Sequence, residues 1–103
     1  EFEAVGLTPL FTENFPAPFV AEADVRIGLK YEQTLKIELN GTELVIASIQ
    51  EVHAPEEIIQ PDGFLDLEKA ETITSSGLDS YHTTHKLSRL SYAKPDRELE
   101  ELG

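Results

Sequence analysis

The chain has 103 residues and a mass of 11.5 kDa, which corresponds to one small domain or to part of one. Its 20 acidic and 8 basic side chains give a net charge of −12, which opposes binding to nucleic acid or to an anionic membrane surface. The absence of Cys excludes disulfides and Cys-based zinc sites and fits a cytoplasmic location. No stretch has the roughly 20 apolar residues of a membrane span, and the chain opens on Glu1 rather than Met, as expected of a fragment or a processed product.

The first 18 residues are predicted to be mostly extended. Residues 2–7 could be the end of a helix that stops at Gly6. Prolines at positions 9, 16 and 18 exclude a helix over the rest of this segment, because proline lacks the backbone N–H that a helix uses.

A period of two dominates residues 19–39, where apolar residues occupy nearly all the odd positions and polar residues most of the even ones. This alternation predicts one long antiparallel strand with one face on a core and the other in water. The residues expected to point inward include Val25, Ile27, Leu29, Leu35 and Ile37.

A hairpin partner is predicted for this strand over residues 42–54. Asn40-Gly41 suits a two-residue turn, because both residues accept positive φ. That turn would place Leu35 opposite Ile46. A bulge near Ala47-Ser48 would instead turn Ile49 inward, so the register beyond that point stays open.

The remainder of the chain is less regular. Pro55 ends the second strand, and residues 61–63 read as a turn. Asp66 is suited to cap a short helix over Leu67–Ile73, and residues 75–77 read as a loop. The charged tail from Lys94 is predicted to be a solvated linker or a helix start.

Three histidines are candidates for chemistry. His82 and His85 have the i, i+3 spacing that could hold a metal on a helix, but their Thr-rich surroundings offer no further ligand, so no metal site is predicted. His53 could donate a proton or contact a cofactor; the simpler interpretation is a surface histidine stabilised by acidic neighbours. Signatures of serine hydrolases, P-loops and dinucleotide-binding turns are absent. The spacing of residues along the chain therefore indicates an antiparallel β domain and identifies no catalytic reaction.

Several sequence blocks, in order along the chain, match one known family. They are Glu1–Pro9 ("D-E-F-x-x-A-G-L-T-P"), Pro18–Leu29, Leu44–His53 ("L-V-I-G-E-V-x-x-V-H"), Asp62–Lys69 ("D-G-x-(V/I)-D-x-E-K"), Ser76–Tyr81 ("G-L-D-x-Y") and Leu90–Pro95 ("Y-A-(R/K)-P"). On these blocks the chain resembles the flavin reductase-like family, whose domain is an FMN-binding split barrel. It departs from the family pattern at Ala47-Ser48, which replaces Gly-Glu, and at residues 25–28, which lack Glu-Cys.

The resemblance implies a mainly β fold, an antiparallel Greek-key split β-barrel with a short helix, of which residues 1–103 form the C-terminal half. It also implies a homodimer in which FMN passes reducing equivalents from NAD(P)H to an acceptor. The family's phosphate-binding segments belong to the other half, so the fragment alone is expected to be inactive and to bind FMN poorly.

The resemblance further implies that Gly77, Leu78, Asp79 and Tyr81 form a loop near the flavin. Gly77 would permit close backbone approach, Asp79 would hold the loop, and Tyr81 would offer a ring edge and a hydroxyl. Two alternatives stay open. Gly77 could simply end the preceding helix with Tyr81 as a core aromatic, and the chain could be a non-enzymatic β module for dimerisation or partner binding.

Overall fold

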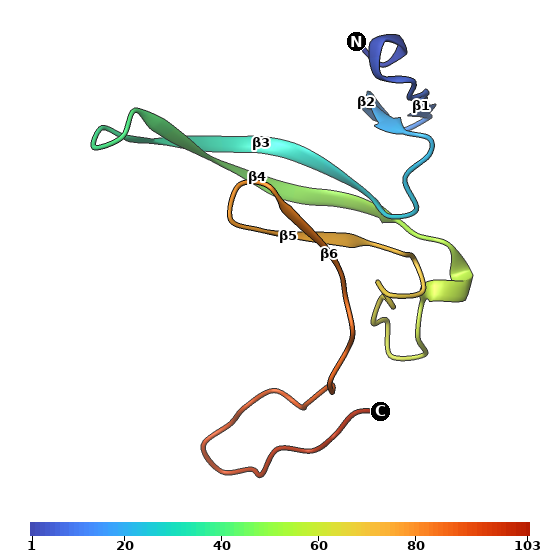
Figure 1. The fold of residues 1–103 in the computed structure, drawn as a ribbon, viewed down its shortest axis with the longest axis vertical. Helices are drawn as coiled ribbons and strands as arrows, with labels where there is room; N and C mark the ends of the chain where they lie inside the picture. Colours follow the sequence, from blue (N-terminus) through green and yellow to red (C-terminus); the bar gives the residue numbers. More distant parts are fainter. The chain divides into compact units, whose positions relative to one another are not determined.

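The computed structural model describes residues 1–103 (Figure 1). Its elements are η1 (Glu3–Val5), β1 (Pro9–Thr12), β2 (Phe15–Val20), β3 (Arg26–Ile37), β4 (Thr42–His53), η2 (Glu56–Ile58), β5 (Ile73–Ser76) and β6 (Ser80–Thr83), where η marks a 3₁₀ helix. Each strand pairs with its neighbour in the chain, which gives three separate antiparallel sheets: β1-β2, β3-β4 and β5-β6. The predicted mainly β, antiparallel fold is confirmed, and the open sheets fit part of a split barrel.

The chain divides into two compact units, residues 1–65 and residues 66–103. The first unit holds η1, η2 and the two hairpins β1-β2 and β3-β4, and the second holds the hairpin β5-β6 and the tail. Neither unit contains a helix with the length and apolar character that a membrane crossing needs.

The N-terminal segment follows the sequence pattern closely. Gly6 ends η1 with a φ of 73°, and its N–H donates to the Glu3 carbonyl at 3.2 Å. A residue in this left-handed conformation is a common helix terminator, so the expected stop at Gly6 is confirmed, although the helix is a single 3₁₀ turn. Beyond it the proline-containing segment is extended, as predicted, and folds into the β1-β2 hairpin.

The predicted single strand over residues 19–39 is wrong, because the chain turns between β2 and β3. The Arg26 side chain closes this turn: its Nε donates to the Val20 carbonyl at 3.1 Å and its Nη2 to the Ala21 carbonyl at 2.7 Å. Alternation of apolar and polar residues reports which face a side chain occupies, and it persists across a short turn between two strands. The pattern therefore merged two strands into one.

The hairpin of β3 and β4 is confirmed, but its loop has four residues, 38–41, instead of two. Leu35 lies opposite Leu44, two residues away from the predicted register. The Gly41 N–H donates to the Ile37 carbonyl at 3.0 Å, and Gly41 has a φ of 69°. The Asn40 side-chain oxygen accepts from the Thr42 N–H and hydroxyl at 3.2 and 2.6 Å, a local turn that Asn favours.

Two irregularities in β3-β4 control where its side chains point. Gln50 is an extra residue in β4, so Ile49 pairs with Leu29. A bulge is therefore present, just beyond Ala47-Ser48, but Ile49 is 64% exposed and is not turned into a core. Glu32 is an extra residue in β3, since Tyr31 pairs with Ala47 and the next pair begins at Gln33. Each extra residue shifts the alternation by one and sends later side chains to the other face.

The apolar side chains of β3-β4 consequently lie on two opposite faces. The base face carries Ile27, Leu29, Tyr31, Val45, Ile49 and Val52, and the tip face carries Leu35, Ile37, Leu44 and Ile46. The hydroxyl of Tyr31 lies 2.7 Å from that of Thr34, as expected if the bulge brings these two residues to one face. The prediction that Ile27 and Leu35 share one inward face is wrong for this reason.

Very little apolar surface is buried. The buried apolar residues are Phe19, Ile58 and Ala70, and Phe19 is 6% exposed. The Phe19 ring packs against Phe15 with 5.0 Å between ring centroids and against His53 with 5.2 Å. This cluster joins β2 to the β3-β4 hairpin and forms the small core of residues 1–65.

The predicted helix Leu67–Ile73 is a turn. Asp66 caps this turn as expected, with its carboxylate accepting from the Lys69 N–H at 3.1 Å and its carbonyl from Ala70 at 3.2 Å. Glu71 then adopts a φ of 57°, which stops helical propagation, and the chain enters β5 at Ile73. The tail from Lys94 is solvent-exposed, as predicted, and contains no helix; isolated bridges join Leu90 to Glu101 and Lys94 to Arg97.

Candidate functional site

The four residues predicted to contact a cofactor lie at the tip of the β5-β6 hairpin. The loop of this hairpin consists of Gly77, Leu78 and Asp79, and the two residues that flank it, Ser76 and Ser80, pair with each other. Tyr81 follows on β6, opposite Ser75. A strand precedes Gly77, so the alternative that Gly77 ends a helix is wrong.

The conformation of Gly77 is what this loop requires. Its φ is 60°, a region where residues with a Cβ are strained, and a Cβ at this position would meet no atom within 4 Å. Space is therefore free around Gly77, and the turn geometry is the local reason for glycine. The same openness leaves its backbone accessible to a planar ligand.

Apolar surface of the loop is directed to solvent. Leu78 is fully exposed and Tyr81 is 74% exposed. Tyr81 is thus no core aromatic in this structure, and its ring and hydroxyl are both accessible. The loop offers one aliphatic and one aromatic contact within four residues.

A polar contact that the sequence did not reveal stabilises the same hairpin. The Ser76 hydroxyl lies 2.8 Å from Nε2 of His82. Both residues lie close to the loop, and the register of the hairpin brings them together. This contact could have been predicted from the sequence only if the register of β5-β6 had been known. His85 lies beyond the end of β6. No three His, Asp or Glu side chains of residues 1–103 are grouped as they would be around a metal ion.

His53 belongs to the other unit and lies at the end of β4. Its Nε2 is 2.9 Å from the Glu51 carboxylate, and its ring meets the Phe19 ring edge-on. The acidic neighbour was expected, whereas the aromatic contact was not. His53 therefore has a structural role in the Phe19 cluster.

The β5-β6 loop fits the ring of a flavin better than its phosphate. Leu78 and Tyr81 provide the apolar and aromatic surface that a planar ring can stack on, and Gly77 leaves room for close approach. Phosphate groups are usually held by basic side chains or by backbone N–H groups at a helix start. Residues 73–83 contain no Lys and no Arg, so a phosphate would need a group from elsewhere.

Comparisons with known proteins gave two informative similarities among solved structures. One is a candidate flavin reductase with a split barrel domain from Shewanella frigidimarina, with 44% sequence identity and a TM-score of 0.83 over 89% of this chain and 46% of that one. The other is the flavoredoxin of Desulfovibrio vulgaris, with 26% identity and a TM-score of 0.67 over 92% of this chain and 48% of that one. No sequence-family profile and no curated protein matches the chain. The chain spans about half the length of the two structures that it matches.

Proposed function

The chain belongs to the flavin reductase-like split-barrel family, and on that premise we propose that it contributes to an FMN-dependent oxidoreductase. In this role reducing equivalents pass from NAD(P)H through FMN to an acceptor. The observation that carries this function is the 44% identity to the flavin reductase structure over 89% of the chain. Because the chain covers 46% of that structure, the activity is assigned to a protein that also supplies the remaining part of the barrel.

The β5-β6 loop would hold the flavin ring. FMN supplies the redox chemistry when bound, and the protein binds and orients it. Leu78 and Tyr81 would cover the ring and exclude water from it, since both side chains are exposed at the loop tip. The Tyr81 hydroxyl can donate a hydrogen bond to a ring heteroatom, and Gly77 keeps the backbone open to close approach.

A homodimer in the cytoplasm is the setting we propose. The base face and the tip face of β3-β4 are both largely exposed, and burial between two copies would remove apolar surface from water. The net charge of −12 opposes nucleic acid and anionic membranes as partners, and a chain without Cys has no disulfide that would need an oxidising compartment.

Flavin titration tests this function. We expect the full-length protein to bind FMN and to absorb at about 450 nm, as oxidised flavins do. Tyr81→Ala should weaken FMN binding by up to about tenfold, the contribution of a good aromatic contact. Tyr92→Ala is the matched control, because Tyr92 is also largely exposed and lies outside the hairpin. Equal effects of the two substitutions would contradict the assignment of the loop. Tight FMN binding by residues 1–103 alone would contradict the need for the remaining part of the barrel.

The alternative is a non-enzymatic β module that dimerises or binds a partner. The small number of buried apolar side chains is consistent with it, because a chain with so little buried apolar surface needs a partner. A full-length protein that is colourless, binds no added FMN and consumes no NAD(P)H would support this alternative over the oxidoreductase.

A further inference from the structure

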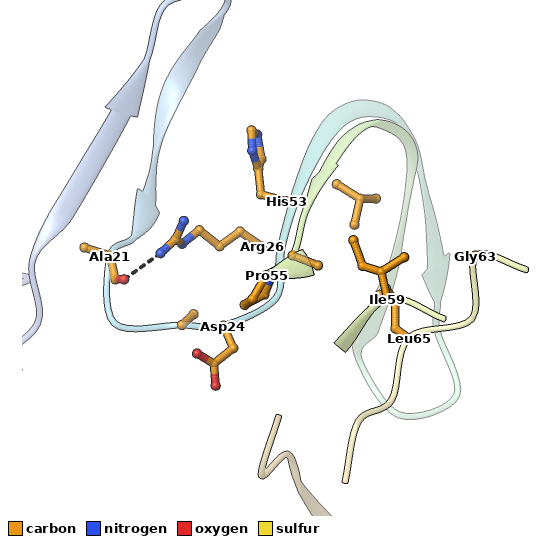
Figure 2. A pocket seen from close by; sticks show the side chains of 11 residues that line it. Ala21, Asp24, Arg26, His53, Pro55, Ile59, Gly63 and Leu65 are labelled. Carbon is orange, nitrogen blue, oxygen red and sulfur yellow. Dashed lines mark hydrogen bonds between the residues drawn. The ribbon is translucent and has the colours of Figure 1, made fainter. Parts of the chain in front are cut away.

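A hollow in residues 1–65 shares no residue with the β5-β6 loop (Figure 2). Its volume is about 610 Å³, within the range of small-molecule sites. Residues of the turn between β2 and β3, the end of β4 and the segment up to Leu65 line it. All of its walls therefore come from one compact unit.

The Arg26 guanidinium borders this hollow and is only partly used by the fold. A guanidinium carries five N–H groups. Two of them donate to the Val20 and Ala21 carbonyls, so three remain available. Figure 2 shows the bond to Ala21, with the Arg26 guanidinium directed at the Ala21 carbonyl.

Arg26 also lacks a negative partner. It is half-buried and makes no ion pair, although the chain has 20 acidic residues. The nearby Asp24 also lines the hollow, yet its carboxylate forms no ion pair or hydrogen bond with Arg26. A half-buried guanidinium whose only partners are carbonyl oxygens keeps its full positive charge, so it is favourably placed to bind an anion.

The rest of the hollow suits an organic molecule better than a free inorganic ion. The hollow has an apolar wall, which is formed by Val52, Pro55, Ile59 and Leu65. His53 lines the same hollow, and its Nε2 is paired with the Glu51 carboxylate at 2.9 Å, so Arg26 supplies the donors for an anion. One cationic group beside an apolar wall is typical of sites for small organic anions.

We propose that this hollow binds the carboxylate or phosphate group of a small organic anion. The oxyanion lies on the free N–H groups of Arg26, and the apolar body of the ligand lies against Ile59 and Leu65. No residue of the flavin loop takes part, so this site stands or falls independently of the proposed oxidoreductase function.

Three ligands with one common body test the site: benzoate, phenyl phosphate and the neutral benzyl alcohol. Each is titrated into the purified full-length protein while NMR follows the Arg26 Nε–H and the His53 ring. We expect one or both anions to shift these signals and the alcohol to leave them unchanged. The anion that binds more tightly shows whether the site takes a carboxylate or a phosphate.

Asp24→Asn removes the one negative side chain that lines the hollow and disturbs no side-chain bond. It should tighten anion binding by about three- to fivefold, the effect of one nearby charge in a largely aqueous setting. Asp96→Asn makes the same chemical change in the tail and should leave the affinity unchanged. Signals that no anion shifts, an alcohol that binds as well as the anions, or equal affinities of the two variants would each overturn the site.

Discussion

Gly28 occupies a position where the structure has no space for a side chain. A Cβ on this residue would lie 2.8 Å from Cε1 of Phe15 and 3.0 Å from Cγ of Glu51. Real carbon atoms do not approach so closely, so the Phe15 ring must shift if Gly28 is replaced. The close contact explains why an otherwise unfavourable glycine occurs inside β3.

Gly28→Ala should therefore destabilise residues 1–65 by about 1–3 kcal/mol, the usual cost of overpacking a core. Urea unfolding of the full-length protein measures this change. Phe15→Leu in the same chain should recover part of the loss, because it removes the ring atoms that clash. If the double variant is no more stable than the sum of the single changes predicts, the contact is not the cause.

Glu22 lies in the turn after β2, and its carboxylate is hydrogen-bonded to Thr8, just before β1. Its carboxylate accepts from the Thr8 N–H at 2.9 Å and from the Thr8 hydroxyl at 2.8 Å. These two bonds, the backbone one first, lower the pKa of Glu22 below its ordinary value, because they favour the charged carboxylate. Its contribution to stability is thus complete above the ordinary pKa and is lost as the pH falls through the lowered one.

We expect the Glu22 carboxyl carbon, followed by NMR, to titrate below the ordinary pKa of a glutamate. Thr8→Ala should move the Glu22 pKa back towards its ordinary value, since it removes one of the two bonds. Glu22→Gln should flatten the stability profile in the acid range. An unchanged Glu22 pKa in Thr8→Ala would exclude the hydroxyl as a cause.

Among the elements, the β3-β4 hairpin depends on single extra residues. Glu32 separates the base face from the tip face, because the alternation of β3 shifts at this residue. Deleting Glu32 should bring Leu35 and Ile37 to the same side as Ile27 and so remove the tip face. Any assembly that needs both faces should be lost.

Size-exclusion chromatography of the Glu32 deletion measures this loss. Glu32→Ala keeps the extra residue and removes only the contact with the Ser48 hydroxyl, so it should assemble like the unchanged protein. A deletion variant that elutes and unfolds like Glu32→Ala would show that the two-faced arrangement is unimportant.

The sequence predicted the type of most elements but not their limits. Alternation identified the strands of β3-β4 and the turn at Asn40-Gly41, because these signals are local. It could not reveal the turn closed by Arg26, since the bonds to Val20 and Ala21 involve carbonyls that any residue carries. It also could not locate the bulges, which depend on how two strands match across the sheet.

The candidate site was predictable only in part. The family resemblance selected residues 77–81, and the structure collects them at one hairpin tip, although their contact with flavin stays a prediction. The Ser76–His82 contact and the hollow beside Arg26 each depend on residues that the fold brings together across a turn or a strand pair. No spacing rule along the chain would have found them.

For the whole molecule, the balance between exposed apolar surface and net charge determines whether two copies of the chain associate. Most apolar side chains of β3-β4 are exposed, and the net charge of −12 repels any second copy. Salt screens this repulsion over a Debye length of about 8 Å at physiological ionic strength. Self-association of residues 1–103 should therefore increase with salt, as measured by light scattering. A monomer at every salt concentration would contradict the need for a partner surface.

The pairing of each strand with its immediate neighbour in the chain has a kinetic consequence. Contacts between neighbouring strands close short loops, and isolated hairpins form in about 1–10 μs. The three hairpins can thus appear early and independently of one another, before any barrel exists. Closing a barrel requires pairing between strands far apart in sequence, which is slower by orders of magnitude. In the interval each hairpin has two free edges that can pair with another chain, so the time before closure is when this protein is most prone to aggregate.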